Sequence, residues 1–292
     1  MNSRRSVTIG VVMSLLLGIL AGRMWASDDA GQSPAPAATA EAVRARLTDG
    51  NARFVTGRCE HPNSDAARLA DTATNGQHPV VTVVSCSDSR VPVERIFDQG
   101  VGDVFVIRVA GNVCGTDELG SVEYGVDHLG TPLLVVLGHS QCGAVTAAVT
   151  KAAVHGSIPA LIDQIAPAVK EAQKNHPGLS GNDLIPAAIQ ANVWHGIHEI
   201  LSRSEAVRER VKAGKLMVVG AIYDLSDGTV AWLGAHPEQA RLLETKAPPG
   251  GHGASAHETP PASAPAAVQV PAAVQAVTAR APRAEARTEH AV

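Results

Sequence analysis

Continuous runs of apolar residues recur along the middle of the chain, and segments of helical periodicity separate most of them. The runs fall at residues 80–84, 104–107, 133–137, 216–219 and 229–233. A run without polar alternation is typical of a strand that is covered on both faces, as in a parallel sheet. The last run follows the turn signal Asp227-Gly228, which predicts an antiparallel edge strand there.

The segments between these runs predict helices. Val43, Leu47 and Phe54 share one face of a predicted N-terminal helix. Further helices are predicted at residues 118–128, 143–153, 158–174 and 182–201. The alternation indicates an α/β domain with a mainly parallel central sheet, about four parallel strands plus an antiparallel edge strand, flanked by helices and preceded by an N-terminal helical extension.

Residues 1–27 have the pattern of an export signal. The motif Ser3-Arg4-Arg5 precedes an uncharged apolar stretch at residues 7–22, shorter than the usual membrane span of about 20 residues. The motif resembles the start of a twin-arginine signal, so we expect export to the periplasm. Cleavage after Ala26 would place Met24 at the third position before the cut, where a small residue is required. Two outcomes therefore stay open: a cleaved signal, or an uncleaved membrane tether through residues 7–22.

The rest of the chain divides into three segments. Residues 28–40 are rich in Ala, Ser, Pro and Gly and are predicted to be a flexible linker. Residues 41–247 contain all of the predicted strands and form one domain. Residues 248–292 are Ala/Pro-rich and lack regularly spaced large apolar residues, so a disordered tail is predicted. Its dispersed histidines are either weak metal scavengers or ordinary surface residues.

Composition narrows the classes of function. Hydrophobic residues make up 45% of the chain but aromatic residues only 3%, so the core must consist mainly of Val, Leu, Ile and Ala. The net charge of −4, without a basic stripe, argues against nucleic acid as a partner. The four cysteines, Cys59, Cys86, Cys114 and Cys142, are too few for a disulfide scaffold.

Two short motifs carry the candidate chemistry. Cys86 and Asp88 follow the first predicted strand, whereas His139 and Cys142 follow the third. Because sites in open α/β sheets form at the carboxyl ends of strands, we expect the two motifs to meet. Two thiolates and one imidazole favour Zn²⁺, and three protein ligands leave a fourth position open for chemistry.

Asp88 has a second possible partner in Arg90. Its carboxylate can bind the metal as a fourth ligand, or it can pair with the guanidinium and leave that position free. A plain surface ion pair is the alternative, although the position beside a zinc ligand argues against it. Cys142 stands where a helix should begin, which lowers the pKa of a thiol. His139 is expected to donate its other ring N–H to a nearby acceptor.

These motifs resemble the β-class carbonic anhydrases, above all in residues 86–90 and 138–144. Further segments that look like the family lie at residues 97–98, 102–103, 105–108, 110–112, 120–125 and 192–193, and the resemblance covers residues 41–233. It implies that Cys86, His139 and Cys142 bind one Zn²⁺ per chain. It also implies that residues 41–247 are a catalytic domain that assembles into homodimers or higher homo-oligomers.

The function implied by the resemblance is that of a carbonate dehydratase, a lyase. Such an enzyme hydrates carbon dioxide reversibly to bicarbonate and a proton by zinc-bound hydroxide. We expect Asp88 and Arg90 to be the catalytic dyad, with Asp88 accepting a hydrogen bond from the hydroxide and only conditionally acting as a metal ligand. Two alternatives stay open: hydrolysis of CS₂ or COS at the same site, and a non-catalytic zinc or thiol-redox module in which Cys86 and Cys142 form a reversible disulfide.

Some positions depart from the family pattern. Val83 stands where bicarbonate-inhibited members carry a Trp, so a regulatory anion pocket is not expected. Gln99 is offset by one position from a Gln that bonds across the dimer in plant-type members, and that role is not transferred to it. Gln141 stands where Asp is frequent.

Two further groups of residues match no position of the family pattern. Cys59 and Cys114 either pair in an oxidising compartment or remain buried thiols. His195 and His198, beside Glu199, are either a second metal site or, on the plainer interpretation, ordinary helix-surface histidines.

Overall fold

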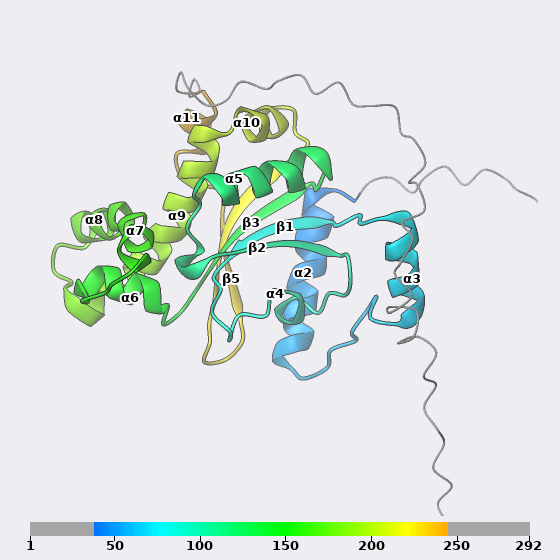
Figure 1. The fold of residues 1–292 in the computed structure, drawn as a ribbon, viewed down its shortest axis with the longest axis horizontal. Coiled ribbons are helices and arrows are strands. Elements are labelled where there is room, and N and C mark those ends of the chain that lie inside the picture. Colours follow the sequence, from blue (N-terminus) through cyan, green and yellow to red (C-terminus); the bar gives the residue numbers. More distant parts are fainter. Residues whose placement is uncertain (1–37, 245–292) are drawn as a thin grey trace, which may run out of the picture. The chain divides into compact units, whose positions relative to one another are not determined.

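The computed structural model describes residues 38–244, in which helices cover both faces of a five-stranded sheet (Figure 1). The strands are β1 (Val81–Ser85), β2 (Val104–Arg108), β3 (Leu133–His139), β4 (Met217–Tyr223) and β5 (Val230–Gly234). Their order is β2-β1-β3-β4-β5, and only β5 runs antiparallel to its neighbour. The predicted fold class is therefore confirmed. The predictions for residues 1–27, 248–292 and most of 28–40 lie outside the described residues.

The two covered faces explain the continuous apolar runs. In β3, Leu134 and Val136 belong to one buried cluster, together with Ile197 of α9. Leu133, Val135 and Leu137 belong to a second buried cluster on the other face. Successive side chains of a strand point to opposite faces, so a strand between two buried layers needs apolar residues at every position.

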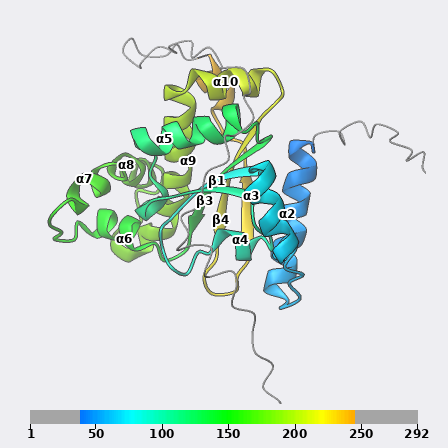
Figure 2. The ribbon, with the colours of Figure 1, turned by 45° about the vertical axis from the view of Figure 1, so that its right-hand side comes forward.

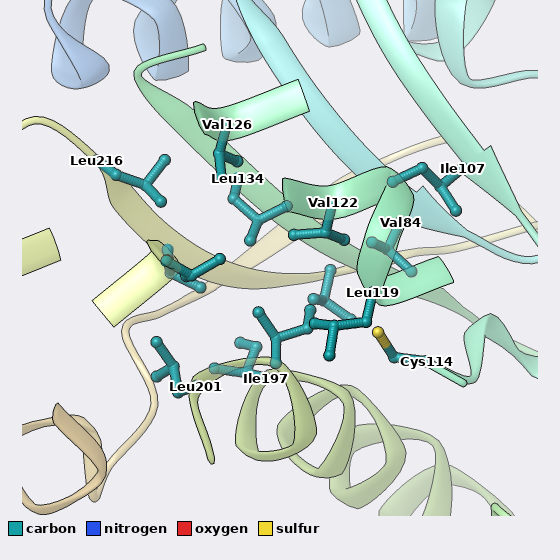
Figure 3. Close-up of a cluster of buried hydrophobic side chains, with 14 of the residues drawn as sticks. Val84, Ile107, Cys114, Leu119, Val122, Val126, Leu134, Ile197, Leu201 and Leu216 are labelled. Atoms are coloured by element: carbon teal, nitrogen blue, oxygen red, sulfur yellow. The ribbon is translucent and has the colours of Figure 1, made fainter. Parts of the chain in front are cut away.

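Different helices cover the two faces of the sheet (Figure 2). One face packs against α5 (Thr116–Glu123), α9 (Ile185–Arg203), α10 (Glu205–Lys212) and α11 (Gln239–Leu243). The other face packs against α2 (Ala40–Val55) and α4 (Val93–Ile96). The close-up in Figure 3 shows Val84 and Leu134 of the sheet near Ile197 and Leu201 of α9, with the Cys114 sulfur at the edge of the same cluster.

A third buried cluster lies beyond the carboxyl ends of the strands. It is formed by α6 (Gly143–Thr150), α8 (Ala166–Asn175), the 3₁₀ turn Gly181–Leu184 and the first turns of α9. It contains Cys86 and Cys142 together with Val145, Ile165 and Ile189. Apolar side chains therefore surround the sulfurs of both cysteines that are candidate metal ligands.

The helix predictions are correct in place but differ in extent. The predicted helix at 158–174 is two helices, α7 (Ile158–Asp163) and α8, because Pro167 has no N–H to continue a helix and stands in the first turn of α8. The predicted helix at 118–128 is α5 followed by a π-helical turn, Tyr124–His128. The sequence missed the exposed α3 (Ala66–Asn75) and the short α4, α10 and α11.

No helix within residues 38–244 is long and apolar enough to cross a membrane. The predicted tether at residues 7–22 lies outside this range.

Gly138 allows β3 to approach α9, and we expect its substitution to destabilise the domain. A Cβ at Gly138 would lie 2.6 Å from Cγ2 of Val193. Such overpacking costs about 1–3 kcal/mol, so Gly138→Ala should lower the free energy of unfolding in urea by that amount.

Gly120→Ala is the matched control for this prediction. A Cβ at this helical position meets nothing within 4 Å among the described residues. Because Gly is a poor helix former, this substitution should raise stability by about 0.5–1 kcal/mol. Equal stability of the Gly138→Ala variant and the wild type would contradict the close approach of β3 and α9.

Candidate metal centre and active site

The strand order places a topological switch point between β1 and β3. From β1 the chain passes to β2 on one side and then to β3 on the other side of β1. In open α/β sheets such a switch point leaves a crevice at the carboxyl ends of the two strands. Cys86 directly follows β1, and His139 is the last residue of β3. The two motifs that lie far apart in the sequence therefore reach the same end of the sheet.

Cys86, His139 and Cys142 converge at this switch point. Their ligand atoms all lie within 4.8 Å of one another, and all three residues are buried. Cys142 is the N-cap residue of α6, where the backbone amides of Ala144 and Val145 favour a negative sulfur. The three residues that were predicted to share a metal thus lie close enough to share one.

The hydrogen bonding of His139 leaves one ring nitrogen free for a metal. Its Nδ1 lies 2.8 Å from the carbonyl oxygen of Ser140, and a carbonyl can only accept, so Nδ1 carries the proton. Its Nε2 is buried and finds no hydrogen-bond partner among the described residues. A buried imidazole lone pair facing two sulfurs suits Zn²⁺, because zinc takes nitrogen and sulfur ligands.

The two neighbouring thiols shift each other's pKa in opposite directions. The Cys142 thiol favours the ionised form of Cys86 and so lowers the pKa of Cys86 against the effect of burial, and His139 and the N–H groups of Gly111 and Asp88 lower it further. Those N–H groups lie 3.2 and 3.4 Å from the Cys86 sulfur. The same pairing and burial raise the pKa of Cys142. Burial lowers the pKa of His139, but Cys86, the carbonyl of Ser140 and Asp88 together raise it, and the net shift is upward.

Asp88 lies beside this cluster and is held by Arg90. The Arg90 Nε–H donates to Oδ1 at 2.9 Å, and its Nη2–H donates to Oδ2 at 2.7 Å. These bonds hold the pKa of Asp88 well below its usual range, so the carboxylate is ionised. Oδ2 lies 3.9 Å from Nε2 of His139. Of the two alternatives for Asp88, this structure contains the pair with Arg90, and binding of the metal by Asp88 stays a prediction.

Arg108 also supports the site, although it lies outside the two short motifs. Its Nε–H donates to the carbonyl of Cys86 at 3.1 Å, and its Nη2–H donates to the carbonyl of Asp88 at 2.7 Å. Arg108 ends β2, the strand next to β1, so its side chain can reach over the loop that follows β1. The signal in the sequence was its place directly after an apolar run.

Hydrogen bonds from α9 and from the end of β4 also support the site. Asn192 of α9 donates to the carbonyl of Gly111 at 2.8 Å, and the N–H of Gly111 in turn faces the Cys86 sulfur. Ser140 accepts a hydrogen bond from the N–H of Leu225 at 2.9 Å through its hydroxyl oxygen and donates to Asp224. The loop that follows His139 is thereby tied to the loop that follows β4.

The departures from the family pattern have plain structural roles. Val83 is fully buried in the core. Gln99 is buried and donates to the carbonyls of Phe97 and Asp98. Gln141 adopts a positive φ of 55°, and its carbonyl accepts from Arg90 at 3.4 Å.

The two remaining cysteines do not pair in this structure. Cys59 and Cys114 are free thiols within the described part of the chain. Burial raises the pKa of Cys114 to about 12, so this thiol is protonated at neutral pH.

Comparison with known proteins identifies the family. The carbonic anhydrase family pattern matches residues 81–230. Carbonic anhydrase 2 of Mycobacterium tuberculosis is 43% identical over 188 residues, which are 62% of this chain and 87% of that protein. The β-carbonic anhydrase CafA of Aspergillus fumigatus matches 70% of this chain and 94% of its own with a TM-score of 0.55 and 28% identity. A tetrameric β-carbonic anhydrase of Sordaria macrospora matches 67% of this chain and 98% of its own with a TM-score of 0.50 and 27% identity. The chain therefore belongs to the β-class carbonic anhydrases.

Proposed function

We propose that this carbonic anhydrase hydrates carbon dioxide reversibly to bicarbonate and a proton at a Zn²⁺ held by Cys86, His139 and Cys142. The observation that carries the proposal is the unpartnered Nε2 of His139, buried beside two thiols that lie within 4.8 Å of it. A structural zinc site is closed by four protein ligands. Here the next carboxylate, Asp88, is engaged by Arg90, which leaves a position for water and substrate.

The chain's own residues orient the reacting groups. When bound, Zn²⁺ supplies a Lewis acid that lowers the pKa of a water in its open position. The ionised Asp88 accepts a hydrogen bond from the attacking oxygen and so directs a lone pair of that oxygen at the carbon of CO₂. Arg90 holds both carboxylate oxygens in this orientation, and Arg108 fixes the backbone on either side of Ser87. The surrounding apolar cluster excludes water from the sulfurs and strengthens these electrostatic interactions.

We extend the proposal to assembly as a homodimer or a larger homo-oligomer. Support comes from β2, whose outer edge pairs with no other strand within residues 38–244. Near it, Tyr124 is 44% exposed and lies 5.8 Å from Phe105 of β2 between ring centroids. An unpaired strand edge with exposed apolar groups is an expected site of association. The similarity to a tetrameric relative agrees with this proposal.

We also propose that the enzyme acts outside the cytoplasm, in the periplasm. This proposal rests on the sequence of residues 1–27 alone, with its basic start and apolar stretch. Whether the signal is cleaved or retained as a tether is decided by the N-terminal sequence of the mature protein.

Removal of the metal tests the function directly. We expect the full chain to bind one zinc tightly and to hydrate CO₂ in a pH-drop assay. A strong chelator should abolish hydration, and added Zn²⁺ should restore it, because Cys86, His139 and Cys142 then hold the Lewis acid again. Tightly bound zinc without any hydration would contradict the proposal and favour a non-catalytic zinc or thiol-redox module.

Asp88→Asn tests the dyad. The amide keeps the shape of the side chain but loses the charge that accepts the hydrogen bond, so we expect kcat to fall at least about 100-fold, the usual scale for a proton-handling group. The zinc content should stay unchanged, because Asp88 is paired with Arg90. Asp71→Asn is the matched control, since Asp71 forms an ion pair with Arg68 on exposed α3. Full activity of the Asp88→Asn variant would refute the role.

The pH dependence should reflect the metal site and not Asp88. The hydrogen bonds from Arg90 keep the pKa of Asp88 well below its usual range, so this carboxylate is ionised at every pH from about 6 to 9. Two thiolate ligands place more negative charge at the site than two imidazoles would, which keeps a coordinated water less acidic. Stopped-flow rates of CO₂ hydration should therefore rise with pH over this range. A rate that is flat across it would contradict this explanation.

A further inference from the structure

A second group of metal-binding side chains lies on one face of α9. His195, His198 and Glu199 each offer a ligand atom, and these atoms all lie within 4.8 Å of one another. Their i, i+3, i+4 spacing on a helix places them side by side. Neither cavity that these residues line includes Cys86, His139 or Cys142, and the mechanism proposed above does not use them.

The two histidines border a cavity of about 840 Å³ between α8, α9 and the start of α11, and Glu199 lines a neighbouring cavity of about 270 Å³ that His195 also borders. His236, from the loop between β5 and α11, also lines the larger cavity. Its ring centroid lies 6.5 Å from that of His198, and the ring packs edge-on against Trp194 at 5.6 Å. A third imidazole from a separate element is therefore held close to the group on α9.

The donor atoms are arranged for binding an ion and not for satisfying one another. Nδ1 of His198 is shielded from solvent and finds no hydrogen bond within the described part of the chain, although it lies 3.5 Å from Oε1 of Glu199. The other oxygen of Glu199 lies 3.6 Å from Nη1 of Arg203. That guanidinium is itself anchored on the carbonyl of Cys114 at 3.0 Å. Such an outer contact orients one carboxylate oxygen and leaves the other directed at His198, as partners of metal ligands do.

The charge state of the histidines agrees with this arrangement. Burial lowers the pKa of His195 and of His236, so both rings are neutral near pH 7 and keep a lone pair. Glu171 of α8, Glu238, Lys174 and Arg241 also line the larger cavity, and Glu238 pairs with Arg241. The shielded, unpartnered Nδ1 of His198 distinguishes this group from histidines that are merely exposed.

We propose that His195, His198 and Glu199 bind a second divalent transition metal, with Zn²⁺ as the favoured ion and His236 as a further ligand. Two or three imidazoles and one carboxylate suit zinc, whereas Ca²⁺ and Mg²⁺ require sets of oxygen ligands. Bonds of about 2.0–2.2 Å require the donors to close in, which rotation of these partly exposed side chains allows. Because this site has no thiolate, it binds zinc more weakly than the catalytic site does. A metal bound here joins α9 to the loop that precedes α11.

The experiment uses the full chain with its catalytic zinc already bound. Further Zn²⁺ is titrated into this holoenzyme, and the additional zinc bound per chain is measured by calorimetry and by metal analysis after dialysis. The wild type should take up one more equivalent than the double variant His195→Ala/His198→Ala. The histidines His252, His257 and His290 are present in both proteins, so their uptake cancels in the difference.

Matched controls separate this site from general histidine binding and from catalysis. The double variant His78→Ala/His155→Ala removes two exposed histidines elsewhere and should keep the second equivalent. The single variant His198→Ala, at a partly exposed position, should lose it without a change in folding. CO₂ hydration by the His195→Ala/His198→Ala variant should equal that of the wild type. Equal zinc uptake by this variant and the wild type would overturn the proposal, as would loss of the catalytic zinc from the variant.

Discussion

The parallel pairing of β1 with β3 is the constraint on which the site depends. Its register places Ser85 opposite Leu137, so Cys86 and His139 leave the sheet at the same edge. A slip of one residue would turn every side chain of the strand to the other face, and both apolar clusters would then have to repack around side chains of different shape. Burial of the hydrophobic core and placement of the metal ligands are therefore enforced by the same register. The free energy that fixes the fold also fixes the distance between ligands of two distant motifs.

Around these ligands, arginines and backbone N–H groups compensate the negative charge. Arg90 binds the carboxylate of Asp88, whereas Arg108 binds the carbonyls of Cys86 and Asp88, so the loop after β1 is held both by its side chain and by its backbone. The N–H groups of Gly111 and Asp88 face the Cys86 sulfur. Charged groups in a largely apolar surrounding are stable only when they are paired in this way. The pairing also keeps the carboxylate and the ligands in one arrangement, which catalysis requires.

The sequence predicted those features that depend on local pattern. The strands were found because burial on both faces demands uninterrupted apolar runs, and the ligand set was found because Cys86 and His139 directly follow two such runs. The position of Arg108 after an apolar run placed it at the end of a strand, but its hydrogen-bond partners could not be predicted, because they depend on β2 lying next to β1 and are backbone carbonyl groups, which every residue has. The break between α7 and α8 could have been read from Pro167, but the apolar periodicity continues across it. The partner of Asp88 stayed open because the metal and Arg90 are both within reach of a carboxylate at that position.

The two clusters of metal ligands differ in how strongly they depend on the fold. Cys86 and His139 come from different strands and meet only when the sheet has formed, so binding of a metal there is coupled to folding of the whole domain. His195, His198 and Glu199 lie on neighbouring turns of one helix, and helix formation alone brings them together. Only His236 would depend on tertiary structure, through the loop before α11. A metal at the first site would therefore stabilise the sheet edge that holds the active site, whereas a metal at the second would act on the packing of α9 against the loop before α11. The contact of α9 with the first site is made by Asn192 through Gly111, and Asn192 is not a member of the cluster at His195, His198 and Glu199.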